Sequence, residues 1–258
     1  MKNKNNLSLK DACSENWPCL SPRQRLAVLQ LLENDHAKAC GRRSRIVTVG
    51  RRFGPNDIAE YIHPKYICIK KEAITSNSPY SGYEAIYSVL HEGYHAFQKD
   101  CVNNLVSEEH IPCRDKVDLW QKNFDVYNDD GDYSVPYIKY RFQPIENDAY
   151  DYADAQLKNL SSIFSDDAHF NTCVLGKEMN RKMYENDACR MFGENYIKEI
   201  ADEIADVYDK NHGISSAISV DNACECKSLD DVLHELKQSD SENRENKRMS
   251  VQELDNER

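Results

Sequence analysis

One short stretch limits the possible folds and functions of this chain more than any other. Residues 88–98, "SVLHEGYHAFQ", carry two histidines four positions apart with a glutamate directly after the first. Such positions lie on one face of an α-helix, one turn apart, so His91 and His95 are expected to project side by side. Two imidazoles placed this way can bind one Zn²⁺ at about 2.0–2.1 Å. Glu92 is rotated from His91 by roughly 100°, which predicts a zinc-hydrolase helix with Glu92 as the general base.

The residues around this motif also favour a buried metal-binding helix. Glu92 is the only charged residue between Ser88 and Gln98, so no lysine or arginine competes with a metal ion for it. Gly93 costs a helix roughly 1 kcal/mol relative to alanine, and we therefore expect another element to approach the helix backbone there. The alternative interpretation is an amphipathic core helix whose two histidines make only structural hydrogen bonds.

A catalytic zinc ion keeps three protein ligands and leaves its fourth position to water, so a third ligand is needed. The remaining downstream histidines lack the short spacing of a three-histidine helix and turn. They are His110, His169, His212 and His234. We predict that Glu146 in "RFQPIENDAYDYADA" is the third ligand, because Ala149 and Ala153 on the same helical face allow tight packing on the histidine helix. Asp148 is the alternative ligand, and the helix dipole alone also favours a glutamate in a first turn.

"HEGYHAFQ" followed by "RFQPIENDAYDYA" resembles the zincin-like metallopeptidases of the gluzincin kind. More narrowly, it is similar to a compact bacterial set with an HEGxHAxQ helix and a later QPxExDA helix, found in toxin-like and mobile-element proteins. The likeness runs from about residue 20 to about residue 160. It implies that His91, His95 and Glu146 are the zinc ligands and that Glu92 is the base, with Asp148 and Gln143 as supporting residues.

The resemblance also implies a cleft for a peptide and a group that stabilises the oxyanion. A strand over 66–74 is expected to form the upper edge of the cleft, to which an extended peptide adds. A tyrosine or histidine is expected to stabilise the oxyanion. The sequence does not choose among Tyr137, Tyr140, Tyr150 and His169.

The expected fold is α+β and mostly helical, a minimal zincin fold with a small β-sheet packed on the histidine helix and a second helix for the third ligand. Paired strands are predicted within 45–53 and 65–74. Helices are predicted over 20–41, 78–100, 114–125 and 143–160, with one or two more over 176–213. Residues 1–19 are expected to be a flexible leader and 216–258 a polar, disordered tail. The metallopeptidase domain then spans 20–215, with a core over 20–160.

Charge and hydropathy exclude some classes of protein. The net charge of −11 argues against nucleic-acid binding, and no apolar run approaches the roughly 20 residues of a membrane span. No Sec-type signal is present at the N-terminus, so we expect a cytoplasmic protein or an effector exported by a non-Sec route. The expected partner is a protein or peptide substrate. The alternative function is a non-catalytic helical interaction module with a structural or absent metal.

Overall fold

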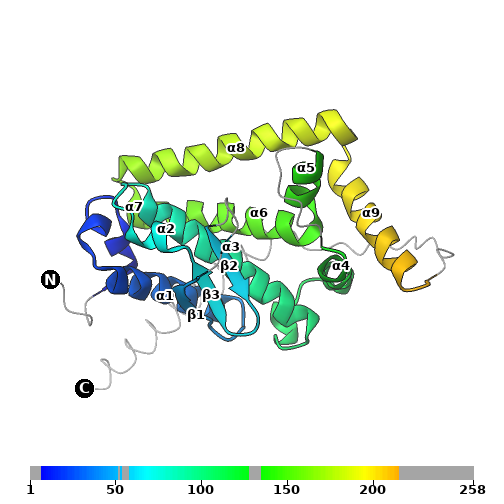
Figure 1. The fold of residues 1–258 in the computed structure, drawn as a ribbon, viewed down its shortest axis with the longest axis horizontal. Coiled ribbons are helices and arrows are strands. Elements are labelled where there is room, and N and C mark those ends of the chain that lie inside the picture. The colour runs from blue at the N-terminus through cyan, green and yellow to red at the C-terminus, as the bar shows by residue number, and fades with distance from the viewer. Residues whose placement is uncertain (1–6, 52, 54–57, 128–134, 215–258) are drawn as a thin grey trace, which may run out of the picture. The chain divides into compact units, whose positions relative to one another are not determined.

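The computed structural model describes residues 7–51, 53, 58–127 and 135–214. The fold is α+β and mostly helical, as predicted, with one small sheet (Figure 1). The helices are α1 (Pro22–Ala39), α2 (Lys71–Thr75), α3 (Ser81–Val102), α4 (Arg114–Asp125), α5 (Val135–Phe142), α6 (Pro144–Asn159), α7 (Ser161–Phe164), α8 (Ala168–Phe192) and α9 (Tyr196–Asn211). The strands are β1 (Ile46–Val49), β2 (Ala59–Ile62) and β3 (Tyr66–Ile69).

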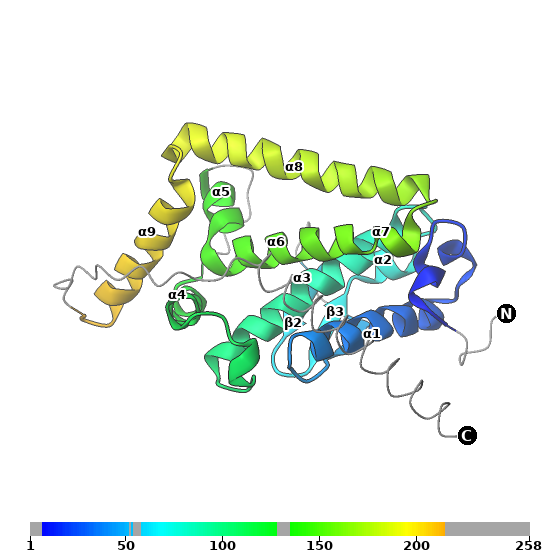
Figure 2. The ribbon, with the colours of Figure 1, turned by 180° about the vertical axis from the view of Figure 1, so that it is seen from behind.

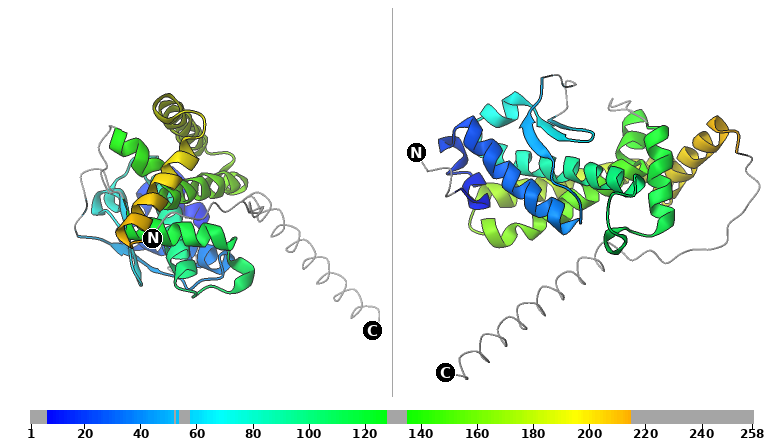
Figure 3. Two further views of the ribbon diagram at one scale, coloured as in Figure 1. Left: turned by 90° about the vertical axis from the view of Figure 1, so that its right-hand side faces the viewer. Right: turned by 90° about the horizontal axis from the view of Figure 1, so that it is seen from below.

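The histidine helix, α3, is the central element of the fold. Most of its side chains are buried, and it contacts α1, α4, α6 and the strands β2 and β3. α6 lies along one side of α3, and α8 runs beyond α6 (Figure 2). The sheet lies against α3 on another side, with α1 beside it (Figure 3). None of the helices that the structure describes is long and apolar enough to cross a bilayer.

The sheet has the strand order β1-β3-β2, with β3 parallel to β1 and antiparallel to β2. The predicted pairing of strands within 45–53 and 65–74 is confirmed, although residues 71–75 form α2. The sequence does not predict β2. The strand has only four residues, Ala59–Ile62, and none of them is fully buried, so it lacks the run of apolar residues that marks β1 and β3. β3 therefore lies in the middle of the sheet, and the expectation that the strand over 66–74 forms a cleft edge is wrong. The edge beside α3 is β2.

Local signals explain where the helices begin and end. The helices predicted over 20–41 and 143–160 begin at Pro22 and Pro144, because proline suits the first helical position. α8 begins earlier than the predicted position 176, because the Asp167 carboxylate accepts hydrogen bonds from the first backbone amides of the helix. It ends at Gly193, whose φ of 81° separates α8 from α9. The short helices α5 and α7 are not predicted.

Residues 7–19 are folded, although the sequence predicts a flexible leader over 1–19. They include the 3₁₀ turns η2 (Leu9–Ala12) and η3 (Trp17–Cys19). Trp17 is fully buried, and Arg25 of α1 lies over its ring at 5.2 Å and donates a hydrogen bond to its carbonyl at 3.0 Å. This segment therefore belongs to the core. The polar tail predicted over 216–258 lies outside the described residues.

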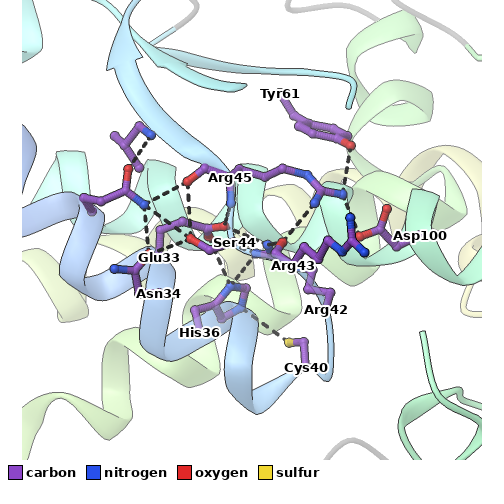
Figure 4. Close-up of polar contacts among 12 residues, drawn as sticks. Glu33, Asn34, His36, Cys40, Arg42, Arg43, Ser44, Arg45, Tyr61 and Asp100 are labelled. Atoms are coloured by element: carbon purple, nitrogen blue, oxygen red, sulfur yellow. Dashed lines mark hydrogen bonds and ion pairs between the residues drawn. The ribbon is translucent and has the colours of Figure 1, made fainter. Parts of the chain in front are cut away.

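A buried group of charged side chains joins α1 to α3 and to the start of β1 (Figure 4). Glu33 accepts two hydrogen bonds from the Arg42 guanidinium, at 2.7 and 2.9 Å, and one from the Arg45 backbone amide at 2.7 Å. Arg42 also donates to Nδ1 of His36 at 3.0 Å, since a guanidinium has no acceptor. Arg45 forms an ion pair of 2.6 Å with Asp100 on α3. We call these five residues the α1 charge cluster.

Burial alone would raise the pKa of Glu33, because the charged form loses its hydration. The hydrogen bonds from the Arg42 side chain and the Arg45 backbone amide, together with the charge of Arg42, outweigh burial and lower the pKa to about 2. A glutamate in an unfolded chain has a pKa of about 4.3. Because the folded value is lower, Glu33 contributes stability above that unfolded value, and the contribution is lost as the pH falls through the folded value.

We predict that Glu33→Gln lowers the free energy of unfolding by about 3–5 kcal/mol, because Arg42 is left buried without its counter-charge. Chemical denaturation should show the same loss at neutral and mildly acidic pH, and a smaller loss below a pH of about 4. The control is Asp118→Asn, which breaks an exposed ion pair with Arg114 and should cost less than about 1 kcal/mol. A loss at Glu33 no larger than that of the control would contradict the prediction.

Candidate metal centre

Three predicted ligands converge where α3 packs on α6. His91 and His95 project from one face of α3, and Glu146 projects from the first turn of α6. Their side chains are almost fully buried, with the three residues 8%, 9% and 2% exposed. Ala149 and Ala153 on α6 are fully buried, which agrees with the close approach of the two helices. Among the described residues this is the one group of three or more metal-binding side chains.

The distances between the donor atoms suit a tetrahedral ion. The two Nε2 atoms lie 3.1 Å apart. Nε2 of His91 lies 3.3 Å from Oε2 of Glu146, and Nε2 of His95 lies 3.2 Å from Oε1. An ion with tetrahedral bonds of about 2.0–2.1 Å separates its ligand atoms by about 3.3 Å. The two imidazole nitrogens are at about this separation and each faces a different oxygen of Glu146, so the three side chains could hold one metal ion.

The charges of the group also suit a cation. Burial alone would lower the pKa of His95, but the Glu146 carboxylate outweighs it and raises the pKa to about 9. Burial would likewise raise the pKa of Glu146, yet the two imidazoles hold it well below its ordinary value. Oε2 of Glu146 is buried and has no hydrogen-bond partner among the described residues. A bound cation would take the place of the proton on His95, so metal affinity is expected to fall as the pH falls.

Gln98 fixes the orientation of His95. Its amide nitrogen donates to the carbonyl of Ile145 at 3.0 Å, so its oxygen must face His95. Nδ1–H of His95 therefore donates to that oxygen, at 2.9 Å, and Nε2 is left for a metal ion. Gln98 also ties α3 to the residue that precedes Glu146. It is the last residue of "HEGYHAFQ", but the sequence alone does not assign it this contact.

The predicted supporting residue Gln143 lies beside the ligand helix and not at the donor atoms. Its Oε1 accepts from the Asn123 amide on α4 at 2.8 Å. The oxygen of the same Asn123 amide accepts from the backbone N–H of Ile145 at 2.9 Å. Both residues are fully buried. Together they fix the start of α6 and thereby the position of Glu146.

The structure does not bring Asp148, the alternative ligand, to the metal-binding group. Its carboxylate accepts a hydrogen bond from Nε1 of Trp120 at 2.7 Å and pairs with Lys116 at 3.1 Å. Both partners are on α4. Two positions beyond Glu146, Asp148 points to another side of α6, and its role is to hold α4 against that helix.

Glu92 lies between α3 and the edge of the sheet. Its Oε2 accepts a hydrogen bond of 2.7 Å from the backbone N–H of Tyr61 on β2. Burial is the main cause that raises the pKa of Glu92, with a smaller contribution from Glu146, while His91 and His95 act in the opposite direction. A raised pKa brings a carboxylate closer to the range in which it can both accept and return a proton near neutral pH.

The tyrosines of α5 and α6 are close to the metal-binding group, and the predicted His169 is not. The ring of Tyr150 lies 4.4 Å from that of His91. Tyr140 is 6.1 Å from Tyr127, whose hydroxyl donates to Oε1 of Glu146 at 2.8 Å. Tyr137 is one step further away, because its ring lies 6.1 Å from that of Tyr140. The contact of Tyr127 was missed, because no sequence spacing marks it.

His169 lies at the N-terminal end of α3, away from the metal-binding group in the middle of that helix. Its ring packs on Tyr80, the residue that precedes this helix, at 5.2 Å, and it pairs with Asp167 at 3.6 Å. The expectation that it could serve as the oxyanion group is therefore wrong. It is isolated in the sequence, and only the packing of α8 on the far end of α3 decides its place.

Gly93 is needed because the α1 charge cluster lies directly against the backbone of α3. A Cβ atom at this position would lie 2.8 Å from Nδ1 of His36 and 3.0 Å from a guanidinium nitrogen of Arg42. Both groups are held in place by Glu33, so neither can move away freely. The close approach expected at Gly93 from the sequence is confirmed, and the approaching element is the end of α1.

We predict that Gly93→Ala destabilises the protein and weakens metal binding, because the added methyl group pushes the turn that carries both histidines. In an open helical position the same change stabilises a protein by about 1 kcal/mol. Gly176 on α8 is such a position, where an added methyl group would meet no neighbouring element within 4 Å, so Gly176→Ala is the matched control. Thermal unfolding that shows the two substitutions shifting stability in the same direction would contradict this account.

We predict that Gln98→Ala lowers the affinity for Zn²⁺ by about 10–100-fold, because His95 loses the partner that orients its ring. Competition with a chelator of known affinity measures the change. Gln121→Ala on α4 removes a hydrogen bond to Asp125 only and should leave the affinity unaltered. If Gln98→Ala and the parent protein bind Zn²⁺ with equal affinity, then packing alone fixes the orientation of the His95 ring.

Comparisons with models of protein families, with curated proteins and with solved structures find no match for this chain. The function is therefore inferred from the side chains of the site.

Proposed function

We propose that this chain is a zinc-dependent metalloendopeptidase of the gluzincin kind, with His91, His95 and Glu146 as ligands and Glu92 as the general base. One observation carries the proposal. The two imidazole Nε2 atoms lie 3.1 Å apart and each faces one oxygen of the Glu146 carboxylate, at 3.3 and 3.2 Å, and Glu92 follows directly after the first ligand. The resemblance of the two motifs to that class of peptidase is a second, independent support.

The donor set favours zinc in a catalytic site over a structural one. Two imidazoles and one carboxylate are typical of catalytic zinc, whereas structural zinc sites are closed by four ligands, mainly cysteine and histidine. Within the described residues the group holds three ligands and no cysteine. When bound in such a site, zinc supplies a water with a pKa near 7 and polarises the carbonyl to be attacked.

Glu92 is placed to move the proton in the proposed reaction. It takes a proton from the attacking water as the water oxygen bonds to the peptide carbonyl carbon. It then gives that proton to the amide nitrogen as the carbon–nitrogen bond breaks, so no other acid is required. The Tyr61 amide holds Oε2 of Glu92 at 2.7 Å, which leaves Oε1 for the water.

The free edge of β2 supports an extended peptide as the substrate. β2 pairs with β3 on one side, where Tyr61 is opposite Ile67, and has no strand on its other side among the described residues. The Tyr61 N–H points to that free side, toward Glu92. An unpaired edge can add an extended chain through backbone hydrogen bonds. A peptide bound there would lie beside the general base.

We predict that the purified protein holds about one zinc ion per chain and cleaves members of a peptide library. Glu92→Gln should keep the metal and lower turnover by about 10²–10⁴-fold, because the proton acceptor is lost. His95→Ala should lose both metal and turnover. Glu84→Gln is the control on the same helix, because Glu84 pairs with Lys177 away from the site.

Metal analysis and mass spectrometry of the cleaved peptides give the two readouts. A parent protein without stoichiometric metal would refute the proposal, as would undiminished cleavage by Glu92→Gln. Stoichiometric metal without any cleavage would favour the alternative, a non-catalytic interaction module in which the ion only stabilises the helix pair.

A further inference from the structure

The two oxygens of the Glu146 carboxylate have different surroundings. Oε1 accepts a hydrogen bond of 2.8 Å from the hydroxyl of Tyr127, which follows the end of α4. Oε2 is buried, lies 3.3 Å from Nε2 of His91 and has no hydrogen-bond partner among the described residues. Oε1 also lies 3.2 Å from Nε2 of His95, so each oxygen faces one imidazole, but only Oε1 accepts a hydrogen bond from Tyr127.

Tyr127 is held in this position by a second tyrosine. Its ring meets that of Tyr140 on α5 at 6.1 Å and at a steep angle of 79°. The side chain of Tyr127 therefore contacts Tyr140 through its ring and Glu146 through its hydroxyl. Removal of the Tyr127 hydroxyl would remove the contact with Oε1 and keep the aromatic ring.

The distinction between the two oxygens matters because a carboxylate can bind a metal ion through one oxygen or through both. Binding through both would fill a position on the ion that a catalytic site leaves to water. A hydrogen bond to one oxygen favours the one-oxygen mode, and hydrogen bonds to ligating carboxylates are a usual means of fixing them.

We propose that Tyr127 is a positioning residue that restricts Glu146 to metal binding through Oε2, with Tyr140 as its support, and so keeps one position of the ion open. This inference rests on the proposed zinc site. It gives Tyr127 a specific role in making the site catalytic: without its hydroxyl the carboxylate is free to turn and to offer both oxygens.

Cobalt(II) substitution tests this directly, because the visible absorption of Co²⁺ is more intense in four-coordinate than in five-coordinate sites. Metal-free protein is loaded with one equivalent of Co²⁺. Tyr127→Phe should bind it but show weaker, shifted bands. With zinc, turnover by Tyr127→Phe should fall about 10–100-fold. Tyr80→Phe, at the opposite end of α3, should match the parent protein in both measurements.

A Co²⁺ spectrum of Tyr127→Phe equal to that of the parent would overturn the inference, even if turnover falls, because the binding mode of Glu146 would then not depend on Tyr127. The exposed ring of Tyr127 is kept in the variant, and circular dichroism verifies its fold. A parent that binds Co²⁺ but cleaves no peptide would refute the proposed function and leave this inference standing if the spectra differ. A parent that binds no divalent ion would refute both.

Discussion

In the described part of the chain, the placement of the histidine helix depends on contact between the backbone of α3 and the α1 charge cluster. Gly93 has no side chain, so the side chains at the end of α1 reach the backbone of α3 at this turn. The space is filled by His36 and Arg42, which Glu33 holds from behind. The same turn carries His91 and His95 on its other face. The α1 charge cluster and the two histidines therefore lie on opposite faces of the same turn of α3.

The buried carboxylates Glu33, Asp100 and Glu146 have different partners. Glu33 is paired with Arg42, and Asp100 with Arg45, so each has a permanent cation nearby. Glu146 is as deeply buried, but the residues around it are two imidazoles and a phenol. An unpaired buried charge is costly, and here only a proton or a metal ion can balance it. Glu146 therefore differs from the other two carboxylates in having no arginine beside it.

Sequence patterns predict the parts of this fold that depend on neighbours along the chain. Proline at the first position marks the starts of α1 and α6, and the four-residue spacing of the histidines places both on one face. Glu146 could be predicted because the chemistry demands a third ligand. The contacts that depend on tertiary packing could not be predicted from the sequence. β2 has too few buried residues to be distinguished, so the sheet edge beside Glu92 was assigned to β3. Tyr127 has no fixed spacing from Glu146, and its place is set by how α4 meets α6.

The three ligands are held by different means, and the means are connected. His95 is fixed by Gln98, which also holds the carbonyl of Ile145, the residue before Glu146. Nδ1 of His91 has no hydrogen-bond partner among the described residues, so its ring is oriented by packing against Tyr150, one turn beyond Glu146 on α6. Both histidines thus take their orientation from α6. The relative placement of the three donor side chains is therefore set by the packing of α3 on α6.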